Sequence, residues 1–444
     1  MSLLGGWGRY PLGESALLRP RSLAAARAAT SDTEAVVARG AGRAYGDAAI
    51  GARATLETSQ LDRMRAFDDE TGILSVEGGV RLADVIDTFL PRGFFPKVVP
   101  GTRFVSVGGA VAADIHGKNH HVDGGFGDTL ESLTLATPDG AQLRLSRTEN
   151  AELFFATVGG MGLTGTVLEA TWRLSKVETG WIRQRTIEAA NLSQALAALS
   201  AGHSSTYSVA WIDGLATGAR LGRSLIFLGE PARRDELDAR ARRLPFGAVP
   251  PPRYRIPFDF PGFALNRLSV GAFNELYYRL GARRTGAPFL VPAGPYFFPL
   301  DGIAEWNRIY GRAGFIQHQC VVPEAAAEAT LGEILSRVAA RGDASFLAVL
   351  KKLGPGTGLL SFPMPGYTLA LDFPLRPGLL EFLDDLDRLV VAAGGRLYLA
   401  KDSRQSRATF EAGYPDLPKF REIRRAVDPR GRLRSRLSDR LGLS

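Results

Sequence analysis

The chain has 444 residues, of which 45% are apolar and 23% charged, with a formal net charge of +8. This composition excludes a disordered chain, and the length suits two globular domains. No apolar run approaches the roughly 20 residues of a membrane span, no signal peptide is apparent, and the single cysteine, Cys320, excludes an internal disulfide. We therefore expect a protein of a reducing compartment, cytoplasmic or peripheral at a membrane surface.

The basic surplus allows nucleic acid, anionic lipid or a phosphorylated substrate as a partner. No zinc-finger, RNP-type or basic-helix signature accompanies it, so we expect no nucleic-acid partner.

The first expected unit is a strand followed by a loop of a size that suits a phosphate. Residues 34–39 predict the strand, and residues 40–47 predict a glycine-rich loop. A second strand is expected at 73–80, and an amphipathic helix follows at 82–90, where a proline and a glycine end it.

A glycine-rich turn then leads into a histidine cluster. Residues 100–109 form the turn, 110–115 start a helix, and 116–121 hold three of the five histidines. The start of a helix offers free N–H groups to a phosphate. A metal is the alternative, but no cysteine is nearby and the only close carboxylates are Asp114 and Asp123, so we expect no metal. A plain loop of hydrogen-bonded histidines is the other alternative.

A dinucleotide-like glycine pattern occurs farther along, in a context that rules out its usual meaning. Residues 133–145 predict a β-hairpin and 152–156 a short helix, and Gly160-x-Gly162-x-x-Gly165 follows. A Rossmann fingerprint needs a strand before it and a helix after it. Here a helix precedes and the alternating strand 166–174 follows, so we reject that fold.

The second half of the chain contains an unusual aromatic segment. We place a domain boundary near 176–183, where the glycine loops end. Residues 244–300 hold 12 of the 40 aromatic residues and six arginines against two acidic residues, and prolines interrupt them. One interpretation is an irregular subdomain whose aromatics form a small core. The other is a lid that faces lipid, with contact to a membrane surface through 244–300.

Four segments together resemble the vanillyl-alcohol-oxidase type of FAD-dependent oxidoreductase: 40–47, 100–121, 159–165 and 398–404. Within that group the chain is most similar to the oxidase components of decaprenylphosphoryl-β-D-ribose 2′-epimerases, from Trp7 to Pro429.

This resemblance implies an α+β fold with two domains, of the vanillyl-alcohol-oxidase/PCMH type. The N-terminal part of the FAD domain would span 1–178, an inserted substrate domain 179–395, and a C-terminal segment at 396–444 would complete the FAD domain.

The resemblance also implies which residues contact FAD. They are Arg39, Gly40, Gly42, Arg43, Ala44, Tyr45, Gly46, Asp47, Gly101, Ser106, Val107, Gly108, Gly109, Ala113, Asp114, Ile115, His116, Val167 and Tyr398. The glycines would let backbone N–H groups approach the pyrophosphate. Some relatives attach FAD through a histidine at about the position of Arg43, so we expect non-covalent FAD.

The expected chemistry rests on Lys401, with His116 and Tyr45 beside the flavin. A lysine there can act as a base or balance charge; the alternative is an exposed loop lysine. The substrate contacts implied by the resemblance are Lys118, Tyr296, Gln317, Gln319, Lys351 and Thr368. Residues 316–320 predict a strand that places both glutamines on one face, although a half-exposed strand would look the same.

One departure lies in 366–373, where better-known members have asparagine for Thr368 and cysteine for Ala370. The lost amide alters the sugar pocket and leaves the exact substrate open, and inhibitors aimed at that thiol should fail.

The expected function is FAD-dependent oxidation of the C2′ hydroxyl of a polyprenyl-phosphoryl ribose to a ketone, completed to an epimerisation by an NAD-dependent short-chain reductase. The alternatives are an alditol or aldonolactone oxidase and a flavin-binding or membrane-surface protein without turnover.

Overall fold

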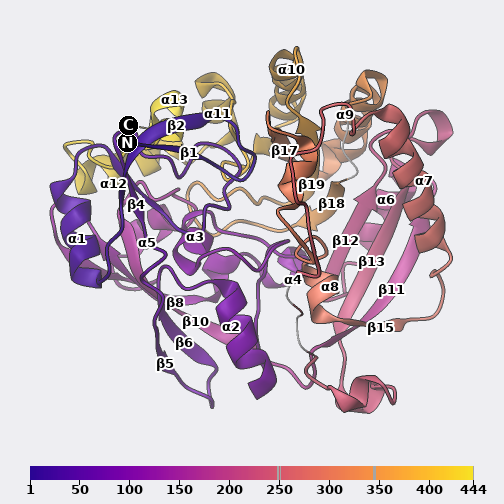
Figure 1. Cartoon of the computed structure of the whole chain (residues 1–444), viewed down its shortest axis with the longest axis horizontal. Helices are drawn as coiled ribbons and strands as arrows, with labels where there is room; N and C mark the ends of the chain where they lie inside the picture. The colour runs from indigo at the N-terminus through magenta and orange to yellow at the C-terminus, as the bar shows by residue number, and fades with distance from the viewer. Residues whose placement is uncertain (248–249, 251, 344–346, 444) are drawn as a thin grey trace.

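The computed structural model describes every residue except 248–249, 251, 344–346 and 444, and it has two lobes (Figure 1). The indigo N-terminal part and the yellow C-terminal helices share one lobe, and the magenta-to-orange middle of the chain forms the other. Both termini lie at the same side of the first lobe. The expected α+β class is confirmed.

The first lobe contains two sheets. One has the order β1-β2-β4-β3, with parallel pairing of β4 to both neighbours, and the other has the order β5-β6-β10-β8-β9 with β7 also paired to β10. The bounds are β1 Ser2–Gly5, β2 Leu12–Leu18, β3 Val36–Arg39, β4 Ala54–Glu57, β5 Met64–Phe67, β6 Ile73–Glu77, β7 Phe94–Pro96, β8 Leu130–Ala136, β9 Gln142–Leu145 and β10 Thr166–Lys176.

The C-terminal tail completes the core of this lobe. Phe420 and Leu437 from the tail are fully buried in the same cluster as Phe154 and Trp172. The helices of the lobe are α1 Leu23–Asp32, α2 Leu82–Phe89, α3 Val107–Ala112, α4 His120–Asp123, α5 Ala151–Thr157, α11 Arg407–Gly413, α12 Leu417–Val427 and α13 Arg436–Leu441.

The second lobe is built on one sheet of eight strands in the order β15-β11-β13-β12-β18-β19-β17-β20. Their bounds are β11 Trp181–Ala189, β12 Tyr207–Ile212, β13 Ser224–Pro231, β15 Phe289–Pro292, β17 Phe315–Val322, β18 Ala348–Leu353, β19 Gly366–Pro374 and β20 Arg396–Leu397; β14 Tyr254–Arg255 and β16 Ile303–Ala304 pair separately.

The two faces of this sheet have different neighbours. Residues such as Ile226, Leu350 and Leu369 pack against three helices: α6 Leu192–Ala201, α9 Ala327–Arg341 and α10 Leu379–Ala392. Side chains alternate between faces along a strand, so the residues between them point the other way. That other face looks toward the first lobe, and it is flanked by α7 Arg267–Ala282 and α8 Ala293–Phe297.

The chain limits of the lobes remain a prediction. Strand β20 lies at the predicted start of the C-terminal segment and still pairs with β17. Leu360 and Phe362, within the predicted substrate domain, are buried in the core of the first lobe.

Two local expectations need correction. Helix α3 begins at Val107, earlier than expected, because Ser106 caps it by accepting the N–H of Gly109. The aromatic segment is not irregular throughout, because its proline-free stretch 262–287 contains the 16-residue helix α7. Its aromatics divide into two sets: Tyr296 and Phe297 are buried together, whereas Tyr254 and Phe263 are exposed. The lid that faces lipid stays a prediction.

None of the helices in the described residues has the length and apolarity that a membrane span requires.

Candidate active site

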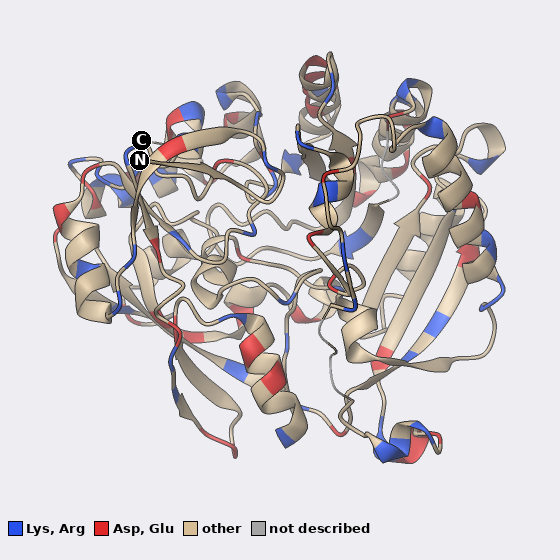
Figure 2. Ribbon diagram, viewed as in Figure 1, with Lys and Arg blue, Asp and Glu red and all other residues tan. Residues whose placement is uncertain are grey.

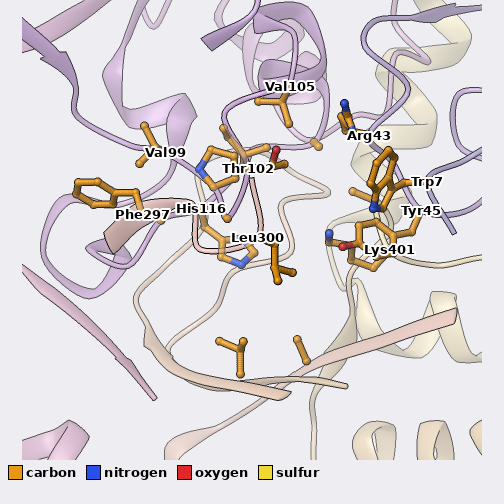
Figure 3. A pocket seen from close by; sticks show the side chains of 18 of the residues that line it. Trp7, Arg43, Tyr45, Val99, Thr102, Val105, His116, Phe297, Leu300 and Lys401 are labelled. Carbon is orange, nitrogen blue, oxygen red and sulfur yellow. The ribbon is translucent and has the colours of Figure 1, made fainter. Parts of the chain in front are cut away.

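A cavity of about 810 Å³ lies between the lobes and is lined by both of them and by the C-terminal segment (Figure 3). From the first lobe it receives the loop after β3, the turn at 99–109 and helix α3. From the second lobe it receives the face of the sheet that α6, α9 and α10 leave uncovered. Residues 398–401 form the join between the two.

The loop after β3 presents its backbone amides to this cavity. Within the described residues, the N–H groups of residues 40–44 donate no hydrogen bond to the chain. Consecutive unpaired amides form an anion-binding concavity. Gly42 has φ +66°, which favours glycine, and a Cβ on Gly101 would meet no atom within 4 Å. The residues present therefore fit a phosphate-bearing cofactor.

Small and flat side chains line the neighbouring wall. Ala113, Ile115 and Val167 face the cavity. Tyr398 donates a hydrogen bond to the carbonyl of Ala113 over 3.0 Å, and its ring stacks on Phe362 with centroids 4.6 Å apart. These contacts fix a flat, largely apolar surface of the kind that a planar ring system requires.

Lys401 lies against the ring of Tyr45, with Nζ 3.5 Å from the ring centroid, and Figure 3 shows the two side chains together. Burial lowers the pKa of Lys401 and raises that of the nearby Asp372, and the attraction between the two groups opposes both shifts. Asp372 is held in place by Gln317, whose amide donates to Oδ1 over 2.6 Å. The site thus has a buried amine with an increased neutral fraction at neutral pH.

His116 has a defined tautomer. Nε2 of Gln319 lies 3.2 Å from His116 Nε2 and 3.3 Å from Thr368 Oγ1. An amide nitrogen can only donate, so His116 Nε2 accepts and the ring proton lies on Nδ1. That atom is buried and has no partner within the described residues. Burial, with the positive charge of Lys351, also lowers the pKa of His116 well below its usual value, so the ring is neutral.

Two further lysines line the cavity without a carboxylate to balance them. Lys118 Nζ donates to the carbonyls of Tyr296 and Phe297 over 2.8 and 3.1 Å, and burial lowers its pKa to about 7. Burial lowers the pKa of Lys351 to about 8, and Nζ makes no hydrogen bond or ion pair with the residues that the structure describes. Two unpaired cations in one cavity favour an anionic ligand.

Most of the residues expected at the site line the cavity. This is true of Lys401, His116 and Tyr45, of all six expected substrate contacts, and of the expected cofactor contacts other than five. The five exceptions are Arg39, Gly46, Asp47, Val107 and Asp114.

These five lie behind the cavity wall, where each supports the residues in front. Arg39 donates to the carbonyls of Gly5 and Ala49, and Asp47 pairs with Arg440 of the tail. Asp114 accepts the hydroxyl of Ser361 and backbone amides, Val107 lies in the core, and Gly46 lies against residue 402. Their contact with the cofactor stays a prediction.

Sequence reasoning missed several residues of the site. Asp372 shares a face of β19 with Thr368, so the two-residue period of a strand could have found it. Trp211 and Phe227 also line the cavity. Strands β12 and β13 are apolar on both faces, so periodicity does not distinguish which face carries them.

The described part of the chain contains no cluster of three or more histidine, cysteine or acidic side chains that could hold a metal. His120 and His121 have other contacts: His120 Nδ1 accepts the N–H of Gly354, and His121 Nε2 lies 3.0 Å from the carbonyl of Ser205.

Comparison with known proteins agrees with this geometry. A family model described as "FAD binding domain" matches residues 20–146, and one described as "D-arabinono-1,4-lactone oxidase" matches residues 372–441. The expected FAD cofactor and PCMH-type fold are thereby confirmed.

Three relatives illustrate the range of similarity. Decaprenylphosphoryl-β-D-ribose oxidase of Mycolicibacterium smegmatis is 40% identical over 99% of this chain and 97% of its own length. An uncharacterised protein of Streptomyces coelicolor is 40% identical over 82% of this chain and 99% of its own. Glucooligosaccharide oxidase of Sarocladium strictum is 32% identical over 29% of this chain and 26% of its own. The chain therefore belongs to the family of FAD-dependent oxidoreductases that includes decaprenylphosphoryl-β-D-ribose oxidase.

Proposed function

We propose that the enzyme oxidises the C2′ hydroxyl of a polyprenyl-phosphoryl ribose to a ketone, as the first half of an epimerisation. The observation that carries this proposal is the meeting of Lys401 with the unpaired cations Lys118 and Lys351 in one cavity. A sugar phosphate needs such cations, and a small neutral sugar does not. The substrate after which the M. smegmatis relative is named supports the same choice.

FAD, when bound, accepts the hydride that leaves the sugar carbon. The amides of residues 40–44 would hold its phosphates. Arg43 would form no covalent bond to FAD, because a guanidinium is not a nucleophile. Its guanidinium stacks on Trp7, 4.1 Å from the ring centroid.

Lys401 would remove the proton of the reacting hydroxyl. Its lowered pKa increases the neutral amine, which can accept a proton at Nζ. The ammonium that results is stabilised by Asp372 and by the face of Tyr45. His116 would pack against the substrate and help to position it, since Gln319 holds the ring in place.

The remaining polar residues would bind the substrate. Lys118 and Lys351 would bind the phosphate, and Gln319 and Thr368 the sugar hydroxyls. Tyr296 and Gln317 also line the cavity and would contact the substrate. The ketone product would be consumed by a hydride-donating reductase, for which we propose an NAD-dependent short-chain enzyme as the partner.

The segment 244–300 would bring the enzyme to an anionic bilayer. Leu268, Leu276 and Leu280 of α7 are 84%, 59% and 49% exposed, and the stretch 262–287 carries four arginines against one glutamate. Figure 2 shows basic residues along this helix and at its end. An exposed apolar stripe flanked by arginine suits the interface of an anionic membrane.

Co-sedimentation with vesicles tests this contact. The double variant Leu276→Glu with Leu280→Glu should lose binding to phosphatidylglycerol vesicles, while Leu3→Glu, an equally exposed leucine of the first lobe, should keep it. Equal binding by both variants would refute a role for α7.

A second candidate function is an aldonolactone or alditol oxidase, favoured by the family match at residues 372–441. The deciding experiment is the absorbance spectrum of the purified enzyme during anaerobic addition of a polyprenyl-phosphoryl ribose or of soluble alditols and lactones. Bleaching of the flavin by the lipid-linked sugar alone supports the proposal. Bleaching only by the soluble sugars would overturn it in favour of the second candidate.

A further inference from the structure

The cavity extends well beyond the residues that the proposed chemistry uses. Beyond Lys351 it continues along the sheet and beneath α7. Most residues that line this extension, here called the apolar arm, are apolar or aromatic: Val209, Trp211, Phe227, Phe289, Val291 and Val349 from the sheet, with Phe273 and Tyr277 from α7. Two polar residues line it as well, Gln184 beside Phe289 and Arg284 near Tyr277.

The floor of the cavity changes from polar to apolar along one row of the sheet. Gln319 pairs with Ala370, Ala370 with Val349, and Val349 with Trp211, so one row crosses strands β17, β19, β18 and β12. The next strand, β13, adds Phe227. From β17 to β13 the floor spans four strand spacings of about 4.8 Å, or roughly 19 Å.

The two cations stand where this change occurs. Lys351 pairs with Thr368 across the sheet, at the edge of the polar end. The apolar arm begins one strand beyond it, so an anion held by Lys351 would have polar groups on one side and mostly apolar groups on the other, where Gln184 and Arg284 are the polar residues of the described lining. From the polar end onward, the cavity therefore suits hydroxyls, then an anion, then a largely apolar chain.

Helix α7 forms the roof of the arm and fixes its width. The same face of the helix is fastened to the lobe: Val270 and Asn274 are buried, and Asn274 donates to Asp213 over 2.7 Å. Tyr277 lies over Trp211 with ring centroids 4.9 Å apart. Phe273 and Tyr277 line the arm and still expose 42% and 38% of their surface, so the arm reaches the surface beside the apolar stripe of α7.

We propose that the apolar arm binds the first isoprene units of the substrate's lipid chain, with the phosphate at Lys118 and Lys351. This inference rests on the proposed function and adds the place of the chain. Because the arm opens beside Leu276 and Leu280, the remainder of the chain can stay in a bilayer while the sugar is at Lys401.

Calorimetric binding of prenyl monophosphates to the FAD-loaded enzyme tests the arm without any turnover. Farnesyl phosphate, with three isoprene units, should bind about tenfold or more tightly than dimethylallyl phosphate, with one. Filling the arm by Val209→Trp, or by Val291→Trp on the edge strand β15, should reduce this ratio to within about threefold. Val122→Trp, at a valine 53% exposed outside the cavity, should keep the ratio of the wild type.

Thermal melting verifies that each variant is folded. If one of the two filling variants fails to fold, the other still tests the arm. A ratio near one in the wild type, or a ratio that survives both filling variants, would overturn the arm as the chain site.

Flavin bleaching by phosphoryl riboses with short and long chains separates this inference from the function on which it rests. If neither sugar bleaches the flavin but the calorimetric ratio behaves as expected, the proposed function fails and the arm remains a chain site. If both sugars bleach it alike and the calorimetric ratio is near one, the function stands and the arm is refuted.

Discussion

The loop after β3 and the turn at 99–109 present backbone amides and small side chains to the cavity, whereas the sheet of the second lobe presents long polar and aromatic side chains. The loop at 40–44 offers five N–H groups and Gly101 offers open space. The sheet of the second lobe offers Gln319, Lys351 and Trp211 instead. A cofactor shared by a family is suited to recognition by backbone, which substitution cannot remove, while substrate choice depends on side chains that can change.

The largest expected effect lies where the lobes join. Lys401→Ala removes the amine that would accept the hydroxyl proton, and we expect the rate of flavin reduction by substrate to fall by about 10²–10⁴-fold. Lys419→Ala, at a surface lysine paired with Glu152, serves as the control. Stopped-flow absorbance measures the rate, and the flavin spectrum verifies that FAD is retained. An unchanged rate would remove Lys401 from the mechanism.

Lys351→Met tests whether a side chain of the second lobe binds the phosphate of the substrate. Loss of a charge-assisted contact of roughly 1.5–3 kcal/mol should weaken binding of farnesyl phosphate by about 10–100-fold. Lys352→Met is a matched control, because the neighbouring residue pairs with Glu324 at 2.8 Å and does not line the cavity. If both variants bind as the wild type does, the phosphate lies elsewhere.

The same variant should be more stable to unfolding at neutral pH. The pKa of Lys351 is about 8 in the folded protein against 10.5 for a free lysine. The unfolded chain therefore binds more protons between these values, and the wild type loses stability as pH falls from 10.5 to 8. Melting of Lys351→Met and wild type should differ most below pH 8 and converge above 10.5.

Gly101→Ile tests whether the open space beside the backbone amides holds the cofactor. A Cβ at this position meets no atom within 4 Å, so we expect folding to be unaffected, and the rest of the side chain would extend into the cavity where the cofactor would lie. We expect FAD affinity to fall by about tenfold or more, or roughly 1.4 kcal/mol. Gly302→Ile, at a glycine with equally open surroundings outside the cavity, should keep full affinity in a fluorescence titration. Equal FAD affinities of the two variants would contradict a cofactor site beside Gly101.

The smallest expected effect is a pH dependence of phosphate binding, carried by Lys118 of the first lobe and Lys351 of the second. The pKa values of about 7 for Lys118 and about 8 for Lys351 mean that both lose their proton as pH rises from 6 to 9. Binding of farnesyl phosphate should weaken about threefold to tenfold over this range. FAD affinity depends on backbone amides and should stay constant. If FAD affinity and farnesyl phosphate affinity fell together, the distinction between backbone and side-chain recognition would be refuted.

The sequence by itself determined the parts that local patterns encode. Period and turn residues predict strand β3, helix α2, the hairpin β8–β9 and strand β17, and the glycine loops point to a phosphate cradle. The resemblance carried by 100–121 and 398–404 led to FAD and to Lys401. These features are local in the chain, so neighbours in sequence suffice to indicate them.

Only the tertiary structure decided how distant segments meet. It brings Lys401 to Tyr45, and Gln319 to His116, each across hundreds of residues. It also turns Asp47 and Asp114 away from the cavity and folds the aromatic segment into a helix above an apolar arm. The physical reason is that a strand buried on both sides carries apolar residues throughout, so its composition does not reveal which face meets a cavity until the other lobe is packed against it.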